Sequence, residues 1–208
     1  MMPWLFAVLF AASRVPGLMP PNFSAVYGFV LCAGAFLPGR IGWIVPLVTM
    51  LVTDVGLNFY YQFGKGWDVW SGASMISHFG NYIGYAVLWG TGRWLRPRAK
   101  LWNLVGGSIV GAALFYLVTN TLAWLFNPFQ NPEYTKTLAG WIIALTSGTG
   151  NWDATWTFFI RSLTSSALFT ALFASTWIYS GAESPADKGE EPVRAPAPAE
   201  AEAEEAKA

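Results

Sequence analysis

The stretch that decides the fold is residues 41–61, which read IGWIVPLVTMLVTDVGLNFYY. A helix needs about 20 apolar residues to cross the hydrocarbon core of a bilayer, and this stretch is long enough. It nevertheless contains a carboxylate, Asp54, within the apolar run. A charge at that depth costs about 3 kcal/mol on insertion scales, so it normally faces protein or water and often marks a functional path. The stretch therefore predicts a membrane helix in which Asp54 has a partner.

The composition separates the chain into two unlike parts. Of its 208 residues, 54% are hydrophobic and only 12% are charged, whereas an average soluble domain has about 25% charged residues. Residues 1–180 carry nine Lys and Arg against four Asp and Glu, but residues 181–208 carry three against eight. The second part is rich in Pro, Ala and Glu, which is typical of disorder. We therefore predict a transmembrane domain over residues 1–180 and a disordered acidic tail over residues 181–208.

Six apolar segments predict an all-α integral membrane protein with six transmembrane helices. They are residues 3–12, 23–37, 41–61, 73–92, 101–126 and 154–179. The first is short, and a cleaved signal peptide is its alternative, although no positive region precedes it. An apolar patch at residues 138–145 is too short to span, so we expect it to cap the domain or to dip in from the interface. The GxxxG pair of Gly107 and Gly111 serves either packing within the chain or dimerisation.

The distribution of positive charge predicts the orientation in the membrane. Four basic residues cluster at positions 93–100, between the fourth and fifth segments, and Arg40 lies between the second and third. The loops on the opposite side carry only three. Loops rich in Lys and Arg stay on the cytoplasmic side. We therefore expect a multi-pass protein of the bacterial inner membrane, with both termini and the acidic tail in the cytoplasm.

Polar residues gather in the half of the predicted membrane domain that faces outward. Arg161 lies about as deep as Asp54, about 10–12 Å from the outer end at 1.5 Å per residue. We expect the two to share a network, either in a solute site or as a purely structural ion pair. Other polar residues of the same half complete the candidate solute-binding set, which is Asp54, Arg161, Asn120, Asn58, His78, Asn81 and Asn22.

This asymmetry predicts a cavity that opens outward. Small-molecule sites are mostly apolar and aromatic, with a few converging polar groups. The aromatic residues expected in the walls are Phe23, Tyr60, Tyr61, Tyr82, Tyr116 and Trp124. Structural alternatives are that His78 is a hydrogen-bonded wall residue, that Asn120 bonds a helix backbone and that the aromatic residues form a belt at the membrane surface.

Several classes of chemistry are not expected. The chain has a single cysteine, Cys32, and a single histidine, and it shows no nucleotide-binding or hydrolase motif. We therefore expect no enzyme activity, no cofactor, no metal centre and no nucleic-acid partner. An intramembrane enzyme would have to rely on Asp54 with His78, the one candidate couple.

A set of motifs resembles an uncharacterised family of bacterial membrane proteins. The motifs are Pro21-Asn22-Phe23, Ala33-Gly34-Ala35, Pro46 with Asp54, Val118-Thr119-Asn120, Trp124, Tyr134, Lys136-Thr137 and Gly140. The resemblance covers most of residues 15–175. It departs at residues 144–152, where the family's pattern has a more apolar segment containing Pro and Phe.

That family looks like the substrate-binding S components of energy-coupling factor transporters. The resemblance implies six helices and an outward site capped by the loops between helices one and two, three and four, and five and six. It also implies that a small-residue face of the first helix, here Ala7 and Ala11, docks on a transmembrane coupling subunit that works with ATPases. The expected function is capture of a small vitamin- or metabolite-like solute. The alternative is a non-transport scaffold held by the Asp54–Arg161 pair.

Removal of residues 182–208 tests the predicted division into two parts. The tail has almost no large apolar side chain to bury, so its loss leaves expression and melting temperature unchanged. Thermal unfolding of the truncated and full-length proteins in the same detergent measures this. A large loss of either would show that the tail belongs to the folded domain.

Overall fold

The structure, a computed structural model, describes residues 2–150 and 152–180, and over this range it contains helices and no strands. The helices are α1 (Met2–Ser13), α2 (Val26–Phe36), α3 (Ile41–Lys65), α4 (Gly72–Leu95), the short 3-10 helix η1 (Arg96–Arg98), α5 (Leu101–Phe126), α6 (Leu138–Leu145) and α7 (Thr155–Tyr179). The all-α prediction is confirmed, and the short patch at residues 138–145 is indeed a separate helix. The predicted disordered tail lies outside the described residues.

Three of these helices are long and apolar enough to cross a membrane, namely α3, α5 and α7. Helix α4 has a comparable length of 24 residues, but Ser, His and Asn interrupt its apolar sequence. Helices α1 and α2 have 12 and 11 residues. At 1.5 Å per residue they are about 17–18 Å long, so neither alone crosses a hydrocarbon core of about 30 Å.

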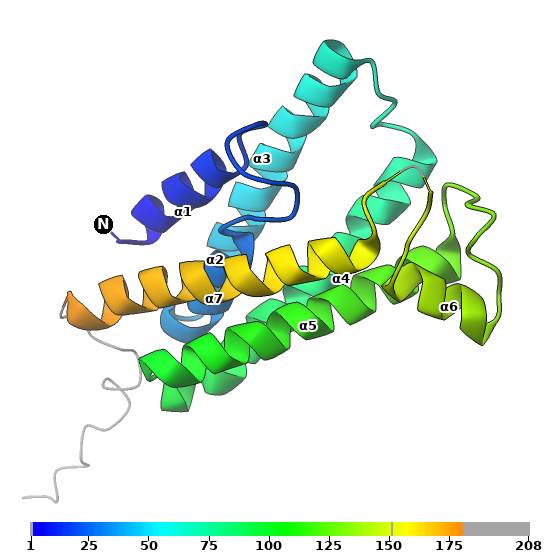
Figure 1. Cartoon of the computed structure of the whole chain (residues 1–208). Coiled ribbons are helices and arrows are strands. Elements are labelled where there is room, and N and C mark those ends of the chain that lie inside the picture. The colour runs from blue at the N-terminus through cyan, green and yellow to red at the C-terminus, as the bar shows by residue number, and fades with distance from the viewer. Residues whose placement is uncertain (1, 151, 181–208) are drawn as a thin grey trace, which may run out of the picture.

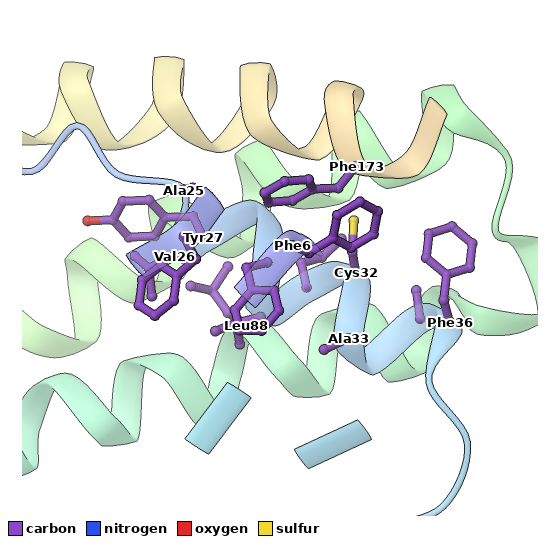
Figure 2. Close-up of a cluster of buried hydrophobic side chains, with 14 of the residues drawn as sticks. Phe6, Ala25, Val26, Tyr27, Cys32, Ala33, Phe36, Leu88 and Phe173 are labelled. Carbon is purple, nitrogen blue, oxygen red and sulfur yellow. The ribbon is translucent and has the colours of Figure 1, made fainter. Parts of the chain in front are cut away.

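Helix α2 lies at the centre of the bundle. All of its residues are buried, and it contacts α1, α3, α4, α5 and α7. Its sequence, VYGFVLCAGAF, is apolar around the whole circumference, and such a helix is typical of a protein core or a membrane interior. Cys32 packs in this core beside aromatic rings from three helices, as Figure 2 shows.

Glycines let the backbones around α2 approach closely. A Cβ atom at Gly28 would lie 2.6 Å from the amide nitrogen of Thr170 in α7. Cβ atoms at Gly34 of α2 and Gly92 of α4 would overlap backbone carbonyl groups of the opposite helix. Small residues at helix contacts are the usual means of close packing in membranes, where water does not drive helices together.

The GxxxG pair of α5 also packs within the chain. Side chains added at Gly107 and Gly111 would meet Leu95 and Leu88 of α4. The packing alternative is therefore the one that the structure supports for this motif.

Helix α7 presents buried hydroxyl residues to its neighbours. Ser162, Ser165, Ser166 and Thr170 are all buried. The hydroxyl of Ser166 donates to the carbonyl oxygen of Ser108 in α5 at 3.0 Å. These small side chains allow α5 and α7 to run side by side along the bundle (Figure 1).

Helix α1 is held by aromatic contacts. The Phe6 ring lies 4.5 Å from Phe173 and the Phe10 ring 5.4 Å from Phe29, measured between ring centroids. Ala7, which the resemblance implies for a docking face, is buried in this core. Ala11 is half-buried. Small residues on α1 serve close packing on its own bundle.

Helix α3 diverges from the rest of the bundle. Figure 1 shows its far end, in cyan, standing away from α5 and α7. Its contacts are mainly with α2 and α1. Beyond Asn58 its side chains are exposed or half-buried, with Phe63 80% exposed. The end of the bundle that carries α6 lies opposite the start of α1 and the end of α7 (Figure 1).

Substitution of Gly92 by alanine tests the close contact between α2 and α4. The added methyl group overlaps the α2 backbone, so we expect the free energy of unfolding to fall by about 1–3 kcal/mol, as in overpacked cores. Denaturant titration in detergent micelles measures this change. Gly90→Ala is the control, because nothing lies within 4 Å of its Cβ position and alanine favours the helix by up to about 1 kcal/mol. Equal stability of the two variants would contradict the packing described.

Candidate solute-binding cavity

A cavity of about 520 Å³ lies at the end of the bundle where α4 and α7 begin and α5 ends. This volume is within the range of about 300–1,000 Å³ typical of small-molecule sites. Its walls belong to α2, α4, α5 and α7, and its rim belongs to the loops before α2 and on both sides of α6. The lining residues are Asn22, Tyr27, Ile76, Ser77, Gly80, Asn81, Tyr85, Phe115, Tyr116, Thr119, Asn120, Leu122, Ala123, Phe126, Pro128, Phe129, Asn131, Tyr134, Thr149, Trp152, Thr155, Phe158 and Ser162.

Aromatic rings and one hydrogen bond close the floor of the cavity. The Tyr27 ring meets Phe115 edge to face at 5.3 Å, and Phe115 packs on Tyr85 at 5.0 Å. The Tyr27 hydroxyl is hydrogen-bonded to the Ser162 hydroxyl at 3.0 Å. The polar tip of Tyr27 is thus satisfied within the protein, as is usual for a buried tyrosine.

Four asparagines line the cavity, and three of them, Asn22, Asn81 and Asn120, were predicted as site residues. Asn120 donates to the carbonyl oxygen of Tyr116 at 2.9 Å, which leaves its side-chain oxygen available as an acceptor. Within the described residues, the side chains of Asn22 and Asn81 make no hydrogen bond to the protein. Asn22 has a φ of 61°, a left-handed conformation that asparagine tolerates better than most residues.

The loops above the cavity contact one another. Trp67 of the α3–α4 loop meets Trp152 of the α6–α7 loop edge to face at 6.1 Å. Lys136 donates to the carbonyl oxygens of Trp124 and Leu125 at 2.5 Å, where a cation stabilises the C-terminal end of α5. Burial, reinforced by the adjacent Glu133 carboxylate, raises the pKa of Tyr134, so its phenol stays protonated at neutral pH.

The structure brings together three of the seven predicted site residues. Asn22, Asn81 and Asn120 line the cavity. The other four, Asp54, Asn58, His78 and Arg161, are not part of its lining. Of the aromatic residues predicted for the walls, only Tyr116 lines the cavity. The main cause is the divergence of α3, which removes Asp54 and Asn58 from the space between α4, α5 and α7.

The predicted pairing of Asp54 with Arg161 is wrong. Asp54 instead pairs with Arg14, with 2.5 Å between Oδ1 and Nη2. The Tyr82 hydroxyl of α4 donates to the other carboxylate oxygen at 2.5 Å. Arg14 also donates to Thr53 at 3.0 Å. The segment after α1 folds against α3, and this brings Arg14 to the depth of Asp54.

Arg161 has a different and more exposed partner. Its Nη1 lies 3.4 Å from Oδ2 of Asp153, and the two side chains are 32% and 60% exposed. Its guanidinium also lies 5.7 Å from the centre of the Phe158 ring. Asp153 precedes the first turn of α7 and lies eight residues before Arg161. The pair is therefore local and does not join two helices.

The Asp54 cluster joins three helices. Arg14 follows α1, Asp54 lies in α3 and Tyr82 lies in α4, and the paired side chains are only 18% and 14% exposed. Tyr82 in turn meets the cavity residue Tyr85 edge to face at 6.0 Å. The cluster therefore fastens the diverging α3 to the helices that form the cavity.

Several lining residues were missed by sequence reasoning, although helical spacing contains the signal. Tyr85 lies one turn after Asn81, so it shares a helix face with a predicted asparagine. Phe158 and Trp152 gave no such signal, because their position depends on the course of the loop between α6 and α7.

Together, the helices and the cavity define a membrane-type helical protein with an uncharged aromatic and amide cavity at one end. The chain belongs to the DUF6580 family, a family of unknown function whose model matches residues 1–186. Neither the curated proteins nor the solved structures gave a match. In the described part of the chain, no cluster of three His, Cys, Asp or Glu residues is arranged to hold a metal ion.

The variant Arg14→Met tests the Asp54 cluster. It leaves the Asp54 carboxylate partly buried without its cation, so we expect a loss of about 3 kcal/mol in the free energy of unfolding. Arg161→Met is the matched control, and the loss of an exposed pair costs about 1 kcal/mol or less. Denaturant titration of both variants measures the difference.

The double variant Arg14→Met/Asp54→Asn completes this test. Because the two side chains contact each other, the double variant loses less stability than the sum of the single variants, with a coupling of about 0.5–3 kcal/mol. Additive losses, or a larger loss from Arg161→Met than from Arg14→Met, would contradict the assignment.

Proposed function

We propose that this protein is a membrane-embedded receptor that captures a small solute in the cavity between α4, α5 and α7. The cavity itself is the observation that carries the proposal. It combines aromatic walls with amide groups that retain hydrogen-bonding capacity. An amide that loses water without gaining a partner costs about 1–3 kcal/mol, so such groups are expected where a ligand completes their hydrogen bonds.

The orientation that we propose has the cavity open to the outer face. Arg93, Arg96 and Arg98 lie in the last turn of α4 and in η1, at the opposite end from the cavity. The positive-inside rule supports placing that end in the cytoplasm of a bacterial inner membrane. In this arrangement α1 to α5 and α7 form six membrane-embedded segments, with α2 shielded from lipid by the others.

Transport of the solute would need a partner. The sequence holds no nucleotide-binding motif, so energy for uptake would have to come from a separate coupling module, as the resemblance to S components implies. The exposed face of α1, with Trp4, Leu5 and Val8, is open to lipid or to such a partner, whereas Ala7 is not.

A non-transport scaffold is the second candidate, and the Asp54 cluster favours it. Arg14 and Tyr82 satisfy Asp54 within the fold, so this buried charge needs no ligand to explain it. The two candidate functions give the cavity different roles. A receptor binds its solute there, whereas a scaffold makes no use of amide groups that face an open space.

The variant Gly80→Leu tests the proposed function by filling the cavity. Gly80 lines the cavity, and the nearest atom to its Cβ position is 3.8 Å away, so a larger side chain enters the space without displacing backbone. We expect small molecules extracted from the purified full-length protein, and detected by mass spectrometry, to be lost from this variant.

Gly90→Leu is the matched control on the same helix. Its Cβ position has nothing within 4 Å and it does not line the cavity, so this variant retains the extracted molecule. Identical extracts from the two variants, or no enriched small molecule in the unmodified protein, would count against a solute receptor and in favour of a scaffold.

A further inference from the structure

The lining of the cavity carries no formal charge. Its 23 residues include no Asp, Glu, Lys, Arg or His. Moving an ion from water into a space without compensating charge is strongly unfavourable, far more so than moving a neutral polar group that finds hydrogen bonds. The cavity therefore disfavours ionised solutes.

Two cations near the mouth, Lys136 and Arg161, already have partners. A second hollow of about 600 Å³ adjoins the cavity and shares Asn22, Trp152 and Phe158 with it. Its one charged residue is Asp153, which faces Arg161 at 3.4 Å. Lys136 is bound to backbone carbonyl oxygens. These two cations are therefore not free to bind an anionic solute at the approach to the cavity.

The walls and the amides point to the shape of the solute. Tyr85, Phe115 and Tyr116 line the cavity, and aromatic rings bind flat molecules by stacking, as aromatic side chains bind bases. An asparagine amide carries a donor and an acceptor side by side, so it pairs with a ligand edge that has the complementary pattern. Asn81 offers this pattern from α4 and Asn22 offers it from the rim. Asn120 of α5, whose amide nitrogen donates to the carbonyl oxygen of Tyr116, offers its side-chain oxygen as an acceptor.

We propose that the cavity selects an uncharged, planar solute whose edge carries a hydrogen-bond donor next to an acceptor, as in an aromatic carboxamide or a pyrimidine-type ring. The inference rests on the proposed function, because it names the chemical class that the receptor would bind. The ring stacks on the tyrosine and phenylalanine walls, and the edge pairs with Asn81 and Asn120.

Matched pairs of probes test the charge preference. The pairs are nicotinamide with nicotinate, benzamide with benzoate and uracil with orotate, each titrated at neutral pH against the purified full-length protein with thermal stabilisation as the readout. We expect at least one uncharged member to raise the melting temperature, and its anionic counterpart to need at least about tenfold more ligand for the same shift.

Asn120→Ala tests the amide contact. This variant weakens binding of the uncharged probe about tenfold, as the loss of about 1.4 kcal/mol of hydrogen bonding does, while the ligand-free protein melts as before. Asn103→Ala is the control on the same helix, since Asn103 is bonded to Arg98 at the other end of α5, and it leaves probe binding unchanged.

The outcomes separate the inference from the function on which it rests. Preferential binding of the anions, no shift with any uncharged probe, or an extracted molecule that is ionised at neutral pH overturns the inference. In each of these cases the proposed function still stands if Gly80→Leu removes the extracted molecule. Loss of the effect of Gly80→Leu overturns both.

Discussion

The close contact of α2 with the backbones of α4 and α7 is the constraint on which the rest of the structure depends. Gly28, Gly34 and Gly92 remove the side chains that would otherwise hold these helices apart. Helix α2 can therefore be short, wholly apolar and completely buried. Because α2 is short, it fills the centre of only one half of the bundle. In the other half α4, α5 and α7 enclose a space, and Tyr27 from the first turn of α2 lies in its floor.

The position of α3 follows from the same packing. Its first half lies on α2, and its second half diverges. The Asp54 cluster compensates for this lack of packing with one ion pair to Arg14 and one hydrogen bond to Tyr82. The partly buried carboxylate of α3 has its partners within the fold, and the polar residues that line the cavity are uncharged and belong to other elements.

Helix positions were predictable from the sequence, because apolar runs separated by Pro, Gly and charged residues mark them directly. Three of the four asparagines that line the cavity were also predicted, since polar residues in the apolar part of the chain are few. The partner of Asp54 was not, because depth along a helix axis says nothing about which face a side chain occupies or how far a helix tilts. Arg161 matched Asp54 in depth, but the divergence of α3 and the fold of the segment around Arg14 decided the pairing.

The neutrality of the cavity has a consequence for energetics. A membrane potential acts only on charge, at about 2.3 kcal/mol per elementary charge per 100 mV. The lining of this cavity contributes no such charge, and the nearby Asp54 and Arg14 sum to zero. Because a membrane potential does work only on charge, it does no work on the step in which an uncharged molecule enters an uncharged cavity.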